Sequence, residues 1–328
     1  MEPLEPQLNF SPSGMLNPAD WGLILAEGSD AGTFLQGQLT NDVILLPTGQ
    51  SRLSGYCSAK GRLLASFVVL KLSQEKFLMV CHKDLIAAMV KRLSMFVLRS
   101  KVKITDATSL FQVSGFLGDA AAASCPALVS EPPWRVVQQS GFYFIQLHPA
   151  RTATAHLARV LRIGISEAPE SHELIPPSHA EISNQDWQLA EVLSGISMVQ
   201  TATAEAFVPQ MLNYESVEGV SFKKGCYPGQ EVVARSQFRG TLKRRAFLVV
   251  CAEPLQVGQE IFSAHDAEQA CGMVSSAAKF EPLDGQSPQW WGIASLQLSA
   301  SQNDLHLAHL TGPVIQRYAM PYPLLEDI

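Results

Sequence analysis

The chain has 328 residues, of which 47% are hydrophobic and 16% are charged, and its formal net charge is −6. This length is enough for two or three domains, and the composition is that of an ordinary globular protein. The acidic balance argues against general affinity for nucleic acid, although a local basic patch can still bind phosphate.

We expect neither a membrane segment nor a secretory signal. The apolar run at 63–70 is far shorter than the roughly 20 residues that a membrane span needs. The first six residues are acidic and interrupted by proline, unlike a signal peptide. The sequence therefore predicts a cytoplasmic protein with no membrane partner.

Six cysteines are scattered along the chain, with no CxxC pair and no clustering with histidine. This spacing predicts no metal site, and without a secretory signal we expect free thiols. The six are Cys57, Cys81, Cys125, Cys226, Cys251 and Cys271.

The first third of the chain is predicted to form strands and two helices. The helices are expected at 29–35, where Ser29 and Asp30 can cap, and at 84–94, where apolar residues repeat on one face. A polar turn follows the first helix at 36–43. Such an order indicates an α+β layer with an antiparallel sheet. The strands are expected at 21–26, 54–57, 63–70, 77–81 and 97–104.

A similar order then recurs, which predicts a second, related unit. Strands are expected near 111–113 and 142–145, followed by a helix at 152–161. The alanine run at 120–123 is compatible with a helix or a linker. The proline-rich segment at 164–183 is expected to be a loop or linker.

Residues 183–240 begin with another helix, which Ser183 and Asn184 can cap and which carries Trp187. After residue 240 the pattern changes to short strands, which predict a small β-barrel or sandwich. We therefore expect two related α+β units over residues 1–240, about 1–110 and 111–240, either consecutive or interleaved. A β-barrel domain is expected over 241–328. The barrel strands are expected at 246–251, 271–274, 291–298 and 305–310.

Reactive groups are densest between residues 223 and 245, where seven basic side chains stand against the single acid Glu231. Gly225, Pro228 and Gly229 predict a tight turn around Cys226. From Gln230 the residues favour a helix, so Cys226 is expected just before a helix N-terminus.

That position, together with the adjacent Lys223 and Lys224, favours the thiolate form of Cys226. The alternative is a small buried cysteine that fills a turn.

The run Lys224-Gly225-Cys226-Tyr227-x-Gly229-Gln230-Glu231 resembles the signature of the YgfZ family. These are folate-binding proteins implicated in tRNA modification and iron–sulfur protein maintenance, and they are relatives of the glycine-cleavage T-protein. The flanking runs 207–210 and 233–240 also resemble the family pattern, as does 36–43. Pro228 departs from it, since Thr or Ser is more usual there, but proline suits a turn.

The resemblance implies a glycine-cleavage T-protein-like fold of two related α/β units with antiparallel sheets and a C-terminal β-barrel. It implies tetrahydrofolate or a related reduced folate as the ligand, and Cys226 as a functional thiol. Iron–sulfur tRNA-modifying enzymes are the implied partners, with direct contact to tRNA left open. Trp21 and Trp187 match tryptophans at the family's folate site, where an indole can stack on a flat pteridine.

The basic patch has two interpretations. It forms either a solvated face in which Glu231 pairs with Arg235, or an anion site for a folate glutamate tail or an RNA phosphate. On the second interpretation Lys224, Gln230, Glu231 and Arg235 join the two tryptophans as candidate folate-binding residues.

The rival function is that of a folate-dependent aminomethyltransferase or another one-carbon transferase. The T-protein carries paired aspartates on the strand after a glycine-containing turn, and the matching residues here are Ala65 and Ser66. Neither can hold the charge that the transfer step needs. The sequence therefore favours a binding protein over a conventional enzyme.

Overall fold

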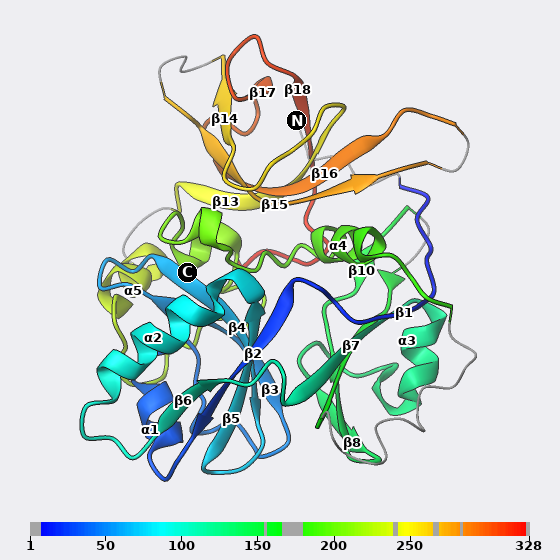
Figure 1. Ribbon diagram of the computed structural model, residues 1–328. Helices are drawn as coiled ribbons and strands as arrows, with labels where there is room; N and C mark the ends of the chain where they lie inside the picture. Colours follow the sequence, from blue (N-terminus) through cyan, green and yellow to red (C-terminus); the bar gives the residue numbers. More distant parts are fainter. Residues whose placement is uncertain are drawn as a thin grey trace.

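The computed structural model describes residues 8–153, 156–165, 180–238, 242–264, 269–282 and 285–325. These residues form two five-stranded sheets and a closed barrel, which give the molecule three lobes (Figure 1).

The first sheet has the strand order β3-β4-β5-β2-β6, and every neighbouring pair is antiparallel. The interior strand β4 is buried along its whole length because most of its residues are apolar on both faces. Helices α1 (Ala31–Gln36) and α2 (Ile86–Val97) accompany this sheet, with α2 packed on β2 and β6. The strands are β2 (Trp21–Glu27), β3 (Ser51–Cys57), β4 (Leu63–Lys71), β5 (Lys76–His82) and β6 (Lys103–Asp106).

The second sheet repeats this arrangement. Its order is β1-β7-β12-β9-β8, which matches the first sheet when β1 takes the place of β6. That edge strand comes from the N-terminus, so the chain contributes to the second sheet before it builds the first. The strands are β1 (Gly14–Leu16), β7 (Phe111–Leu117), β8 (Val136–Gln139), β9 (Phe142–Gln146) and β12 (Arg159–Ile165).

The C-terminal strands close into a barrel in the order β13-β16-β15-β14-β17-β18, because β18 pairs with β13. Closure leaves no free sheet edge. The strands are β13 (Arg244–Cys251), β14 (Glu260–Ser263), β15 (Gly272–Phe280), β16 (Gln289–Gln297), β17 (Leu305–Leu307) and β18 (Val314–Tyr318).

The structure describes three further helices. Helix α3 (Asp119–Ser124) packs on β1 and β7, α4 (Asn184–Leu193) lies between the barrel and the second sheet, and α5 (Gln230–Phe238) follows the signature (Figure 1). The short elements are β10 (Ala150–Arg151), β11 (His156–Leu157) and the 3-10 turns Lys83–Leu85, Pro126–Leu128, Thr201–Thr203 and Pro209–Leu212.

The α+β class, the hairpin of β3 and β4, the helix at α4 and the barrel are confirmed. The alanine run forms a helix, α3. Most of the segment expected to be a linker, 166–179, lies outside the described residues, as do Arg239 and Gly240.

Two predicted elements were wrong. The expected helix at 152–161 is replaced, in its described part, by strands, because Arg159–Ile165 is a central strand buried between β7 and β9. The expected strand at 97–104 begins only at Lys103, since Val97 extends the apolar row of Met89 and Leu93 and keeps α2 going. Strands β14 and β18 of the barrel were not predicted.

No helix within the described ranges is long and apolar enough to cross a membrane. Those same ranges hold no group of three or more His, Cys, Asp or Glu side chains that could bind a metal ion.

Candidate functional site

Two tryptophans from distant parts of the chain meet where the first sheet approaches α4. Trp21 opens β2, and Trp187 lies in the first half of α4. Their ring centroids are 6.2 Å apart and their planes are at 75°, the edge-to-face arrangement that aromatic pairs favour. The fold therefore brings together the two residues that the resemblance assigns to folate.

Local sequence holds Trp187 in place. The Ser183 hydroxyl accepts a hydrogen bond from the Asp186 N–H, and the Asp186 carboxylate accepts one from the Ser183 N–H, which forms a capping box. Gly115 of β7 lies against the indole, and a Cβ at this position would come within 2.6 Å of the ring. The buried setting of Trp187 thus depends on a glycine in the second sheet.

A carboxyl group completes the tryptophan pair. Glu191 follows Trp187 by one helical turn, and its Oε1 accepts a hydrogen bond from Trp187 Nε1 at 3.0 Å. Arg159 of β12 places Nη2 3.7 Å from the same oxygen and its guanidinium 4.9 Å from the centroid of the Trp187 ring. The buried Nε of Arg159 has no hydrogen-bond partner among the described residues, so the cluster retains a free donor.

The protonation of this cluster is shifted by burial. Burial raises the pKa of Glu191 to about 7, and the Arg159 charge and the two indole N–H groups oppose the rise. Burial lowers the pKa of Arg159 to about 10, and burial together with the Arg159 charge lowers the pKa of His148 to about 4. Burial in this cluster therefore favours the neutral form of Glu191 more than exposure to solvent would.

A cavity of about 280 Å³ opens beside this cluster, and we call it the tryptophan cavity. Trp21, Glu191, Ile196 and Met198 line it and also line a small inner extension that reaches Trp134, His148 and Arg159. The Glu191 side chain is 22% exposed. The other lining residues are Asp20, His82, Gln188, Val192 and Gln200, with Val257, Ser276 and Ala277 from the barrel.

The signature loop lies elsewhere. Lys224 is buried, and its ammonium donates to the backbone carbonyls of Gln36 and Leu39 and lies 5.0 Å from the centroid of the Tyr227 ring. Burial lowers the pKa of Lys224 to about 8, against the opposing charges of Asp42 and Cys226. This lysine thus ties the loop to the end of α1.

The Cys226 thiol is exposed, whereas the other five cysteines are buried. Helix α5 begins four residues later at Gln230, and Arg235 pairs with Glu231 at 2.7 Å on its exposed face. Burial raises the pKa of Cys57 and of Cys81 to about 12. The exposed thiol is therefore the reactive candidate by access.

The structure does not bring all the predicted site residues together. In the described part of the chain, Lys224, Gln230, Glu231, Arg235 and Cys226 do not line the tryptophan cavity. Lys224 and Cys226 lie instead on the signature loop, and Gln230, Glu231 and Arg235 lie on α5.

The residues that match the T-protein aspartates are part of the core. Ala65 and Ser66 are fully buried in β4. The Ser66 hydroxyl oxygen accepts hydrogen bonds from Tyr214 Oη at 2.5 Å and from the Val199 N–H at 3.0 Å. This position is occupied by structural hydrogen bonds.

Sequence reasoning missed Glu191 and Arg159. The signal for Glu191 was present, since an acid four residues after Trp187 falls on the same face of the predicted helix. No comparable signal existed for Arg159, because its segment was predicted to be helical.

Comparison with known proteins decides the family. Residues 12–181, just over half of the chain, match the family model described as the GCVT N-terminal domain. The tRNA-modifying protein YgfZ of Photobacterium profundum is 32% identical over 252 residues, which cover 74% of this chain and 71% of that protein. This chain belongs to the YgfZ family.

Other similarities agree with a YgfZ-family fold. An uncharacterized protein of Haemophilus influenzae is 26% identical over 318 residues, which cover 96% of this chain and 100% of that protein. The crystal structure of the glycine cleavage system aminomethyltransferase T from Bartonella henselae matches with a TM-score of 0.63 over 97% of this chain and 88% of that chain. At 16% identity this likeness concerns the fold alone, and it confirms the T-protein-like architecture that the signature implied.

Proposed function

We propose that this chain binds tetrahydrofolate or a related reduced folate in the tryptophan cavity, and that it supports tRNA modification by iron–sulfur enzymes in the cytoplasm. The observation that supports the folate proposal is that Trp21 and Glu191 line one cavity while the buried Trp187, which packs against Trp21 and donates to Glu191, lies directly behind them.

The chemistry of the cavity suits a reduced pterin. A pterin ring presents flat apolar faces and, on one edge, an amino group and a ring N–H. The Glu191 carboxyl can accept hydrogen bonds from that edge, and Trp21, Ile196 and Met198 supply apolar contact. The Arg159 Nε is a free donor for a pterin oxygen or nitrogen.

The size of the cavity also fits this assignment. About 280 Å³ lies at the lower end of ligand pockets, enough for the bicyclic ring while the aminobenzoyl-glutamate tail extends outward. When bound, a reduced folate supplies a carrier for a one-carbon group.

For the signature residues we propose a separate role in the same function. Cys226 would act as the functional thiol toward partner proteins, because it is the exposed cysteine and it lies on an exposed loop. Lys224 would act by holding this loop, while Gln230 and Arg235 on α5 would receive the anionic tail or a phosphate and Glu231 would orient Arg235 through their ion pair.

Titration with tetrahydrofolate tests the folate assignment, with intrinsic tryptophan fluorescence as the readout. We expect quenching in the parent protein and binding weakened about tenfold in Trp21→Ala, which loses aromatic contact, and in Trp187→Ala, which removes the packing and the hydrogen bond that hold Trp21 and Glu191 at the cavity. Trp290→Phe, which changes a barrel tryptophan outside the cavity lining, is the matched control and should bind like the parent. Equal affinity in both alanine variants would refute the assignment.

A further inference from the structure

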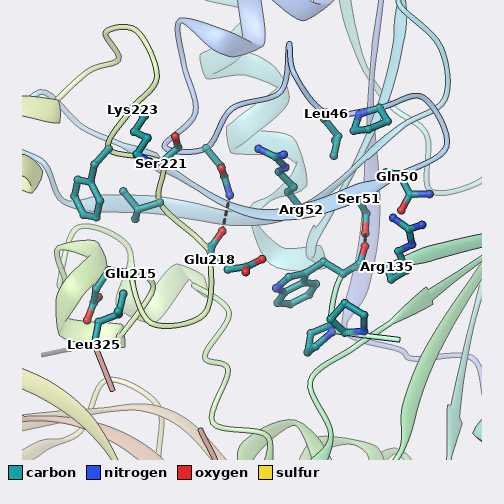
Figure 2. A pocket seen from close by; sticks show the side chains of 17 residues that line it. Leu46, Gln50, Ser51, Arg52, Arg135, Glu215, Glu218, Ser221, Lys223 and Leu325 are labelled. Carbon is teal, nitrogen blue, oxygen red and sulfur yellow. Dashed lines mark hydrogen bonds between the residues drawn. The ribbon is translucent and has the colours of Figure 1, made fainter. Parts of the chain in front are cut away.

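A second and larger cavity, of about 670 Å³, lies between the two related units, and we call it the interunit cavity (Figure 2). Its walls come from residues 41–52, from 132–135 ahead of β8, and from 215–223, which lead into the signature. Trp21, Trp187 and Glu191 do not line it, and it shares only Trp134 with the inner extension of the tryptophan cavity.

The walls of this cavity are fixed before any ligand arrives. The Ser51 hydroxyl donates to the Trp134 carbonyl at 2.6 Å. The Gln50 amide pairs with the backbone of Val136 in both directions, each at 3.2 Å. These bonds join the first unit to the second across the cavity, which is the preorganisation that a binding site requires.

Cationic groups at the interunit cavity are left unpaired. Arg52 donates to the carbonyl of Asp42, but no carboxylate of the described residues pairs with Arg52 or with Lys223. The buried Glu215 is neutralised by Arg245 at 2.9 Å. Two unpaired cations on a preformed cavity favour an anionic ligand.

Other charged groups are Arg135, whose Nε lies 3.5 Å from Glu131, and Glu218, whose exposed carboxylate has no ion-pair partner among the described residues. Between the charges lie apolar surfaces, including three proline rings. The apolar residues that line the cavity there are Leu46, Pro47, Pro132, Pro133 and Phe222.

We propose that the interunit cavity binds a nucleotide, either free or as one residue of an RNA strand. Its phosphate would meet Arg52 and Lys223, its base would lie against the proline rings, and base amino groups would donate to Glu218 (Figure 2). Lys223 precedes Cys226 by three residues, so their Cα atoms lie within roughly 11 Å. The nucleotide would thus bind next to the loop that carries the exposed thiol. This inference goes beyond the folate proposal and does not depend on it.

Calorimetric titrations test it with GMP, with inorganic phosphate and with a phosphorylated RNA hexamer as the probes. The variants are Arg52→Ala and the exposed Lys223→Glu, and the control is Lys103→Glu, an exposed lysine on β6. We expect each variant to weaken GMP binding about fivefold or more, with the control unchanged, because each variant removes one charged contact to phosphate. Thermal melting checks that every variant is folded.

The same titrations distinguish a free nucleotide from a nucleotide that is part of an RNA strand. If the hexamer binds about tenfold more tightly than GMP and shows the same losses, RNA is the natural ligand. If GMP binds as well as the hexamer, the ligand is a free nucleotide.

Four results would overturn the proposal. These are absence of GMP and hexamer binding at millimolar concentration, unchanged binding in folded Arg52→Ala and Lys223→Glu, inorganic phosphate binding as tightly as GMP, and competitive displacement of GMP by folinic acid. The last result would make the cavity part of a folate site, whereas failure of folate binding alone would leave the nucleotide result intact.

Discussion

At position 191 a glutamate faces the tryptophan cavity beside two indoles and a buried arginine. Its carboxyl is ordinary in sequence and becomes unusual only through burial and through Arg159, which a strand from the second sheet supplies. The family match could select Trp21 and Trp187 from the sequence. The pairing of Glu191 with Arg159 beside Trp187 could not be predicted, because it depends on how the lobes pack together.

Changing this glutamate should alter the pH dependence of stability. The pKa of Glu191 rises on folding from 4.5 to about 7, so the folded state holds the proton more tightly. The contribution of this group to the free energy of unfolding therefore falls as pH rises through that window. Glu191→Gln cannot titrate and should lack this fall, so the difference between parent and variant should change by about 1–3 kcal/mol from about pH 5 to about pH 8.

Urea unfolding at both pH values measures that difference, with the exposed Glu75→Gln as control. Parallel stability profiles for the parent and Glu191→Gln would contradict the assigned shift.

Cys226 should be the first cysteine to react in the native protein. It is exposed while the other five are buried, so alkylation at neutral pH should modify Cys226 well before Cys81, as followed by peptide mass spectrometry. Cys226→Ser should keep the melting temperature and fail to complement a strain that lacks the family protein. Equal alkylation of Cys81, or full complementation, would return Cys226 to a structural role in the turn.

The signature loop is shaped by a close approach to the turn between β3 and β4. Gly229 has φ +79°, and a Cβ there would lie 2.4 Å from the Ser58 carbonyl oxygen and 2.5 Å from the Gly61 nitrogen. On the other side of the thiol, Gly225 has open space around it. The sequence predicted the turn and the helix after it, and both are present, but it could not show which glycine the packing requires.

The two glycines offer a matched pair of substitutions. Gly229→Ala should lower the free energy of unfolding by about 1–3 kcal/mol, since it adds backbone strain and a clash. Gly225→Ala, in the same loop, should change it by less than about 0.5 kcal/mol. Chemical denaturation compares them, and similar losses for both would show that the approach to Gly61 is unimportant.

Helices and strands whose apolar residues repeat with a clear period were predicted well, and segments whose apolar residues fit either period were not. The run Arg159–Ile165 has apolar residues compatible with either a helix or a strand, and its place between β7 and β9 decides the outcome. The short strands β14 and β18 carry little signal by themselves and form because the barrel closes.

On the scale of the whole molecule, two sheets of matching strand order and a barrel surround the tryptophan cavity, and each lobe supplies part of its lining. The sequence predicted this architecture through its signature, because 222–240 resembles the family closely. It could not predict the exchange of β1 into the second sheet, which places an N-terminal strand beside β7.

A protein that shares the fold of the T-protein need not catalyse the aminomethyl transfer that the T-protein catalyses. Ala65 and Ser66 are buried and supply no carboxylate, so we expect no turnover of an aminomethyl donor with tetrahydrofolate above the buffer rate. Ammonia release, measured together with formation of methylenetetrahydrofolate by the purified protein, tests this. Turnover proportional to protein concentration would support the transferase function instead.

Binding of a reduced folate through Glu191 in the tryptophan cavity is the central proposal for this protein. Calorimetric titration of tetrahydrofolate into the parent, Glu191→Gln and the control Glu75→Gln tests it most directly. We predict saturable binding to the parent and the control, and affinity about tenfold lower in Glu191→Gln, because the carboxylate acceptor is lost while the hydrogen bond from Trp187 remains possible. No binding to the parent, or equal affinity in Glu191→Gln, would contradict it.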